Sequence, residues 1–131
     1  QFAVRIHDYL SNYEVEDYSA LKLLTLGRHY RIDNAKVVVG RNEFENNLLT
    51  KICKQQDILV NPLGVMGPTA VIHCKEMVDK QTIDLVGQIV ASYSDCDDDN
   101  CTLTVDSLTE SYTIEVTRVD RDSFSKYMLV K

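Results

Sequence analysis

The sequence predicts an α+β fold in a single domain, residues 1–131, with a mixed or antiparallel sheet and three to five helices. The chain has 131 residues, 44% of them apolar and 26% charged, enough for the core of one globular domain. Helices, a hairpin, a helix, two strands, a helix and two more strands are expected in that order, without the regular β-α-β alternation of a parallel sheet. No apolar run approaches the roughly 20 residues that span a bilayer, so we expect a cytoplasmic protein with no membrane partner.

The N-terminal quarter predicts two helices. The first covers about 2–12, where helical and strand features are mixed. Asp17 is a suitable N-cap for the second, and Gly27 is suited to the position just after its last turn. The apolar stripe of this second helix is Ala20, Leu21 and Leu24.

A β-hairpin follows. The run 28–32 alternates in character, the run 35–39 is rich in β-branched residues, and Asp33-Asn34 is a turn dipeptide. Gly40 ends the second strand. Asn42 is then a plausible N-cap of a helix that runs to about Lys54, with Glu45 reaching back in a variant of the capping box. The expected buried stripe of this helix is Phe44, Leu48, Leu49 and Ile52.

The second half predicts strands around one long helix. We expect strands at 57–61 and 69–74, a loop at 62–68, a helix from Asp79 or Lys80 to Tyr93, an acidic loop at 95–100, and strands at 101–106 and 112–119. The inward stripe of the long helix is Ile83, Val86, Ile89 and Val90. The tail from Asp122 fits a short helix or a strand equally well.

The charge is distributed unevenly. The chain carries -6; residues 1–60 hold 8 basic and 8 acidic residues, and 61–131 hold 6 basic and 12 acidic ones. Between 28 and 41 the sign reverses locally, with Arg28, Arg31, Lys36 and Arg41 against Asp33. A basic strand-turn-helix in an acidic protein indicates a small anion-binding surface, and phosphate is the commonest such anion.

Gly40-Arg41-Asn42 is the sharpest candidate within this segment. A strand that ends in glycine and leads into a helix leaves free backbone N–H groups, the helix dipole favours an anion, and Arg41 adds a bidentate fork. A capped helix with a solvated arginine explains the same residues. Arg28 and Arg31 lie on opposite faces of their strand, and Tyr30 and Tyr93 either stack on bases or fill core edges.

The sequence offers no catalytic or metal centre. It contains no Walker motif, no nucleophile elbow, no zinc-protease motif and no dinucleotide fingerprint. The four-residue gap between Cys96 and Cys101 does not fit zinc ligands, and all four cysteines are expected to be reduced thiols. Cys53 and Cys74 fit small buried apolar residues. A metal-binding enzyme domain that uses His29, Cys96 or Cys101 stays an alternative.

Two segments together resemble a known domain. The run LLTLGRHYRI at 23–32 and the run VVVGRNEFEN at 37–46 resemble the C-terminal domain of bacterial PP-loop tRNA thiouridylase-like proteins. The segments 57–60, 67–70 and 89–94 continue the likeness, which covers about 18–95. The domain is similar to the RNA-binding domain of the NFACT ribosome-quality-control proteins.

The resemblance implies an auxiliary RNA-binding domain, with tRNA or another RNA as partner, attached to a PP-loop catalytic domain that transfers sulfur with ATP. Because the first residue is Gln, we expect a C-terminal fragment of such a protein, with an ATP-dependent tRNA sulfurtransferase as the parent and no cofactor of its own. The alternative is a protein-interaction or dimerisation module that docks on a catalytic domain. The residues expected at the RNA, from the resemblance and the local charge, are Arg28, His29, Arg31, Lys36, Gly40, Arg41, Asn42 and Asn46.

Overall fold

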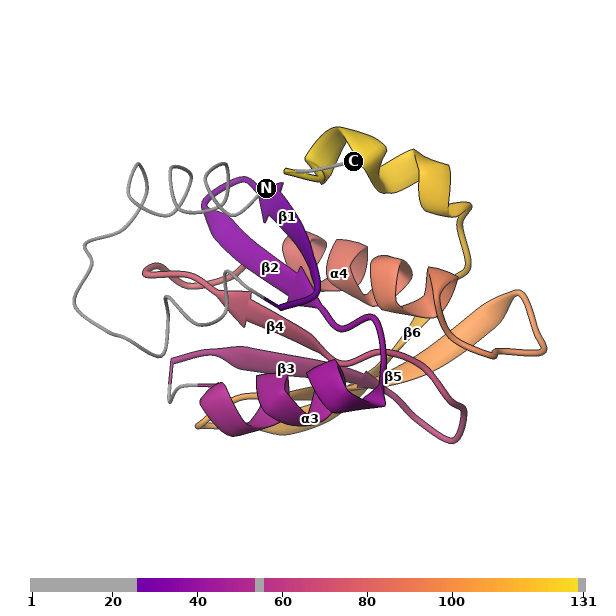
Figure 1. Cartoon of the computed structure of the whole chain (residues 1–131), viewed down its shortest axis with the longest axis horizontal. Coiled ribbons are helices and arrows are strands. Elements are labelled where there is room, and N and C mark those ends of the chain that lie inside the picture. Colours follow the sequence, from indigo (N-terminus) through magenta and orange to yellow (C-terminus); the bar gives the residue numbers. More distant parts are fainter. Residues whose placement is uncertain (1–25, 54–55, 130–131) are drawn as a thin grey trace.

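The computed structural model describes residues 26–53 and 56–129 (Figure 1). The strands are β1 (Arg28–Ile32), β2 (Ala35–Val39), β3 (Ile58–Pro62), β4 (Ala70–His73), β5 (Asn100–Asp106) and β6 (Ser111–Thr117). The helices are α3 (Glu43–Ile52), α4 (Lys80–Ser92) and the 3-10 helix η1 (Arg121–Tyr127). The two helices expected at 2–12 and from Asp17 lie outside the described residues.

The six strands form one antiparallel sheet in the order β1-β2-β4-β3-β5-β6. This confirms the α+β prediction and decides between a mixed and an antiparallel sheet. Successive residues of β2 face opposite sides of the sheet. Val38 packs with Leu49 of α3, whereas Val37 belongs to the larger core that contains Val86 and Ile89 of α4. The two α-helices therefore cover opposite faces of the sheet.

All five residues of β2 are buried because the strand is central and both of its faces are covered. The turn before it needs a left-handed residue, and Asp33 supplies it at φ 51°. Gly27 also has a positive φ, 70°, and a Cβ there would lie 2.5 Å from the carbonyl oxygen of Val39. The hairpin therefore starts where only glycine fits.

Helix α3 differs from the expected one in its buried face. Asn42 is its N-cap, as predicted, and its Oδ1 accepts from the N–H of Glu45 (2.9 Å). Leu49 is buried, but Phe44 is 69% exposed, so its placement in the apolar stripe is wrong. Phe44 lies one residue, about 100° of rotation, before Glu45, and Glu45 holds the inward position. The helix ends at Ile52, two residues earlier than expected.

Helix α4 confirms its prediction. Asp79 is the N-cap, with its carboxylate 2.8 Å from the N–H of Thr82. All four residues of the expected inward stripe are buried, namely Ile83, Val86, Ile89 and Val90. None of the helices in the described part of the chain combines the length and the apolar character that a membrane span requires.

The tail forms the 3-10 helix η1, which settles the open choice in favour of a short helix. Phe124 anchors it in the core, at 3% exposed. The chain then returns to the outer edge of β1, where Met128 bridges Tyr30 and the N–H of Leu129 donates to the carbonyl of His29 (3.0 Å). Figure 1 shows this yellow segment beside β1. The end of the chain therefore closes one edge of the sheet.

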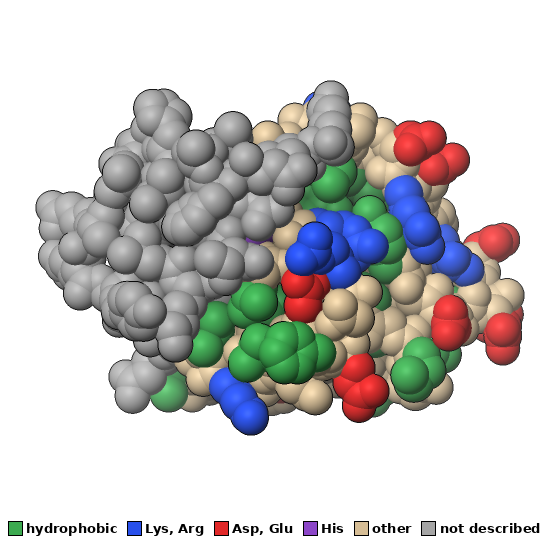
Figure 2. All heavy atoms as spheres, in the orientation of Figure 1, with side chains coloured by type: hydrophobic (Ala, Val, Ile, Leu, Met, Phe, Trp, Pro, Cys, Tyr) green, Lys and Arg blue, Asp and Glu red, His purple; other side chains and the backbone are tan. Residues whose placement is uncertain are grey.

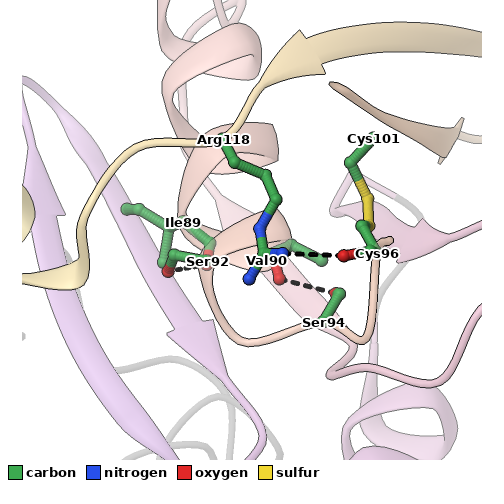
Figure 3. The surroundings of a disulfide bond; sticks show 7 residues. All are labelled: Ile89, Val90, Ser92, Ser94, Cys96, Cys101 and Arg118. Carbon is green, nitrogen blue, oxygen red and sulfur yellow. Dashed lines mark hydrogen bonds between the residues drawn. A yellow bond between two sulfur atoms is a disulfide. The ribbon is translucent and has the colours of Figure 1, made fainter. Parts of the chain in front are cut away.

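Cys96 and Cys101 form a disulfide across the acidic loop, so the expectation of reduced thiols is wrong for this pair (Figure 3). The loop is tied further by Arg118, whose Nη1 donates to the carbonyl of Cys96 (2.7 Å). Cys74 is buried, as expected, and Cys53 is half-buried. Burial raises the pKa of the Cys53 thiol to about 11, which keeps it protonated at neutral pH.

Candidate nucleic-acid interface

A pocket of about 300 Å³ opens where β1, the turn after β2, the start of α3 and the end of α4 meet. We call it the arginine pocket; it is lined by Arg28, Gly40, Arg41, Asn42, Asn46, Gly67, Pro68, Tyr93 and Arg121. Three of these residues are arginines and none is acidic. Figure 2 shows Lys and Arg side chains gathered near the centre of one face, with most acidic side chains around its rim. The arginine pocket therefore suits an anion.

Two of the arginines are held on one aromatic ring. The Cζ atoms of Arg28 and Arg121 lie 4.2 Å and 4.4 Å from the centroid of Tyr93. Arg28 Nη1 also donates to the carbonyl of Gly40 (3.3 Å), and Arg121 Nε donates to the carbonyl of Ser92 (2.9 Å). Cation–π contact and hydrogen bonds together orient both guanidinium groups before any ligand arrives.

Tyr93 itself lies beside a buried residue of β1, Tyr30. Tyr30, on the same face of β1 as Arg28, is 1% exposed. Burial raises the pKa of Tyr30 well above its ordinary value, and the hydrogen bond with Tyr93 adds to the shift. Tyr30 therefore stays neutral, with its hydroxyl beside Tyr93.

Arg41, the arginine of the Gly-Arg-Asn turn, is paired within the protein. Its Nε and Nη2 donate to the two carboxylate oxygens of Glu45, at 2.9 Å and 2.6 Å. Glu45 also accepts from the backbone N–H groups of Arg41 (2.9 Å) and Gly27 (3.2 Å). The Arg41 guanidinium lowers the pKa of Glu45 to about 2, and Glu45 raises the pKa of Arg41. Glu45 thus binds the backbone N–H of Arg41, the residue before the N-cap. In the expected capping box it would bind the N–H of the N-cap, Asn42, itself.

Gly40 and Asn46 line the pocket and are packed directly against each other. Asn46 Oδ1 accepts from the N–H of Thr69 (3.0 Å), while the N–H of Gly40 donates to the carbonyl of Thr69 (2.9 Å). A Cβ on Gly40 would lie 2.0 Å from Asn46 Oδ1. These two residues and the N-cap Asn42 line the pocket, and their described contacts join the β2–α3 turn to the loop before β4.

The structure does not bring His29, Arg31 and Lys36 to the arginine pocket. They lie on the other face of the hairpin, because side chains alternate along a strand. His29 is 2% exposed and Lys36 is 3% exposed, and His29 Nε2 donates to the carbonyl of Leu26 (2.6 Å). Arg31 is half-buried and donates to the carbonyl of Asn34 (3.3 Å). The basic residues of 28–41 therefore do not share one surface, and an RNA contact of His29, Arg31 or Lys36 stays a prediction.

Sequence reasoning missed three residues of the pocket, Arg121, Gly67 and Pro68. Arg121 belongs to the short tail helix, so no local motif connects it with Arg28. Stacking on bases is one of the two roles that the sequence allows for Tyr93; in the structure its ring stacks on arginines of the protein. The alternation of β1 was the one signal that separated Arg28 from its basic neighbours.

Comparison with known proteins extends the likeness further along the chain. Residues 27–128 match the family described as NFACT protein RNA binding domain, so the part after residue 95 is included. No curated protein matches. The C-terminal part of the fibronectin/fibrinogen-binding protein from Streptococcus suis has a similar structure, with a TM-score of 0.69 and 15% identity. The likeness covers 79% of this chain and 49% of that one, so the chain spans about half its length. The chain belongs to the NFACT protein RNA binding domain family.

Proposed function

We propose that this domain binds RNA through the arginine pocket, with Arg28 and Arg121 as the main phosphate contacts. The observation that carries the proposal is the pair of guanidinium groups on the Tyr93 ring, in a pocket whose described lining residues include no acidic side chain. Arginine presents five N–H donors in a planar fork that fits phosphate oxygens. Because Tyr93 already orients both forks, less side-chain entropy is lost on binding.

Arg41 has a supporting role in this proposal. Glu45 takes one donor from Nε and one from Nη2, which leaves three of the five N–H donors for a ligand. The positive charge is largely balanced by the carboxylate, so Arg41 contributes hydrogen bonds and little net charge. The N-terminus of α3, capped by Asn42, adds the favourable end of the helix dipole.

The affinity of the isolated domain should be modest. Two or three phosphate contacts give a small electrostatic contribution, and the chain carries -6 overall, which repels RNA elsewhere. We propose tRNA as the RNA and the cytoplasm as the compartment. We also propose that the domain assists a PP-loop protein that transfers sulfur to tRNA with ATP. The support for this larger context is the likeness of the runs at 23–32 and 37–46 to such proteins.

A salt series of tRNA binding tests the site. We expect affinity to fall as salt rises, and Arg28→Ala and Arg121→Ala each to weaken binding and to flatten the log–log salt slope by about 0.7–0.9 per lost phosphate contact. Lys80→Ala is the matched control, since Lys80 is an exposed lysine at the far end of α4. If the two arginine variants behave like Lys80→Ala, the arginine pocket is not the RNA site.

A protein-docking role is the second candidate. Two large apolar side chains are exposed near the arginine pocket, Phe44 at 69% and Met66 at 75%. Phe44 comes shortly after Arg41 in the sequence, and Met66 directly precedes Gly67. Arg41 and Gly67 both line the pocket. An apolar rim of this kind fits a protein partner. If tRNA does not bind at low salt, while Phe44→Ser abolishes association with a catalytic domain of the same protein, docking replaces RNA binding.

A further inference from the structure

The two outer edges of the sheet, at β1 and β6, differ in whether another segment of the described chain pairs with them. The outer edge of β1 is closed by the tail, through the Tyr30–Met128 bridge and the hydrogen bond from Leu129 to His29. Among the described residues, β6 pairs along its length only with β5, so no described strand covers its outer edge. Proteins usually protect such an edge with lysine, proline or a bulge. The sequence of β6, SYTIEVT, has neither lysine nor proline.

The ladder shows which groups of β6 point outward. The N–H of Ser107 donates to the carbonyl of Glu110, and the N–H of Arg118 donates to the carbonyl of Asp99. Hydrogen-bonded and non-hydrogen-bonded pairs alternate in an antiparallel ladder. Ser107/Glu110 and Asp99/Arg118 are both hydrogen-bonded pairs. Alternation between them places Ser111, Thr113 and Glu115 in non-hydrogen-bonded pairs. Their N–H and C=O groups therefore face away from β5 and are placed to receive another strand.

An apolar pocket lies next to this edge. It has a volume of about 620 Å³, in the range of ligand sites, and lies between the start of α4 and the β5–β6 turn. Tyr112 and Ile114 of β6 line it, together with Met77 and Leu108. Met77 is 96% exposed and Leu108 is 70% exposed. Methionine adapts readily to different apolar side chains, so the mouth of the pocket suits a side chain from a partner.

The rim of this pocket is acidic. Glu76, Asp84 and Glu110 lie around it, and Lys80, the one basic side chain among its described lining residues, is paired with Asp84 (2.9 Å). Burial raises the pKa of Tyr112, and Glu110 and Asp84 add to the rise, as expected in a negative potential. Such a rim repels phosphates and attracts lysine or arginine. The pocket also lies at the opposite end of α4 from Tyr93, about 20 Å away along a 13-residue helix.

We propose that β6 and this pocket form a docking site for an extended peptide segment of a partner protein that carries lysine or arginine and large apolar side chains. The segment adds as a seventh strand through the outward groups of Ser111, Thr113 and Glu115. One apolar side chain enters the pocket beside Tyr112, and the basic side chains face Glu76 and Glu110. Backbone pairing with side-chain pockets is a common mode of peptide recognition.

The test uses the 131-residue chain labelled with ¹⁵N and a synthetic peptide of alternating lysine and isoleucine. We expect amide shifts confined to β6, the β5–β6 turn and the start of α4. The same peptide with glutamate in place of lysine should not bind. Thr113→Pro removes one outward N–H and should weaken binding about tenfold or more. Thr113→Val keeps that N–H and is the matched control; circular dichroism confirms that both variants fold.

Other outcomes would overturn the proposal. Shifts around Tyr93 in place of β6, equal binding of the glutamate peptide, or equal affinity of the two Thr113 variants would each contradict strand addition by a basic segment. Shifts of β6 that grow with protein concentration, without peptide, would show that a second copy occupies the edge. The outcome is separate from that of the RNA proposal, because Arg28→Ala should leave peptide binding unchanged.

Discussion

The guanidinium of Arg41 lies on the carboxylate of Glu45, with Nη2 2.6 Å from Oε2, one helical turn further along the chain. Arg41 stands out in the sequence as the arginine of a Gly-Arg-Asn turn at a helix start, where an anion is expected. The structure supplies that anion from within, and the same carboxylate also binds the N–H of Gly27. The uncompensated charge in the arginine pocket therefore comes from Arg28 and Arg121.

Acid should destabilise the domain through Glu45. Its pKa is lowered from 4.5 to about 2, mainly by Arg41. The stability from this shift is fully present above pH 4.5 and is lost as the pH falls toward 2. It corresponds to about 3 kcal/mol. Urea unfolding at pH 7, 4.5 and 2.5 measures it. Glu45→Gln should unfold more easily at pH 7 and show a smaller loss in acid, and an equal loss in both proteins would contradict the assignment.

Glu45→Gln should also change RNA binding. Without the carboxylate charge, Arg41 contributes a third uncompensated positive charge to the arginine pocket. The log–log salt slope of tRNA binding should steepen by up to about 0.9, the value for one added contact. Arg41→Ala in the wild-type background should have a smaller effect than Arg28→Ala, because its charge is already balanced. A loss on Arg41→Ala as large as on Arg28→Ala would contradict this.

The Tyr93 ring can be tested separately from its hydroxyl. Tyr93→Phe keeps the aromatic face for Arg28 and Arg121, so RNA affinity should stay within about twofold of wild type, with a stability loss of about 1 kcal/mol for the hydrogen bond to Tyr30. Tyr93→Ala removes the face and should weaken RNA binding as much as losing one arginine. Fluorescence anisotropy with labelled tRNA distinguishes the two. Equal affinities of the variants would mean that the ring does not orient the arginines.

Gly40 and Asn46 should be energetically coupled. Gly40→Ala places a methyl group where Asn46 Oδ1 now lies, so the amide must move and release the N–H of Thr69. We expect a cost of about 2 kcal/mol. In an Asn46→Ala background the side-chain clash is gone and the backbone N of residue 46, at 3.2 Å, is the nearest remaining atom, so the same substitution should cost less than about 1 kcal/mol. A double-mutant cycle by urea unfolding measures the difference, and additive costs would contradict the contact.

Local signals in the sequence predicted the frame of this fold well. The dipeptide Asp33-Asn34, the N-caps Asn42 and Asp79 and the alternation after Cys101 each act within a few residues, and the structure places each element of the described residues within about two residues of the prediction. The side of a helix that is buried is set by the sheet it meets. The inward position of this helix is taken by Glu45, whose carboxylate accepts from the N–H of Gly27. The apolar pattern alone therefore misplaced Phe44.

The site was predictable only in part, for the same reason. Arg28, Gly40, Arg41, Asn42 and Asn46, which belong to the two Gly-Arg segments, all line the arginine pocket, and their contact with RNA stays a prediction. His29 and Lys36 are buried on the other face of the hairpin, a consequence of strand alternation combined with a central β2. Arg121 reaches the pocket through the packing of η1 against α4 and β1, and periodicity gives no information on such a long-range contact.

The Cys96–Cys101 disulfide should protect two of the four cysteines from alkylation. In unfolded protein without reductant, only Cys53 and Cys74 should react, and a dithiol should make all four reactive. The two cysteines are five residues apart in the sequence. Reduction removes the stabilisation from closing this loop, about 2 kcal/mol of folding free energy. The fold and tRNA affinity should persist, since Arg118 still holds the carbonyl of Cys96 and the N–H of Asp95 still donates to Met66 (2.8 Å). Mass spectrometry counts the alkylated thiols, and urea unfolding with and without dithiol measures the stability. Four reactive thiols before reduction would show that the bond does not form in solution.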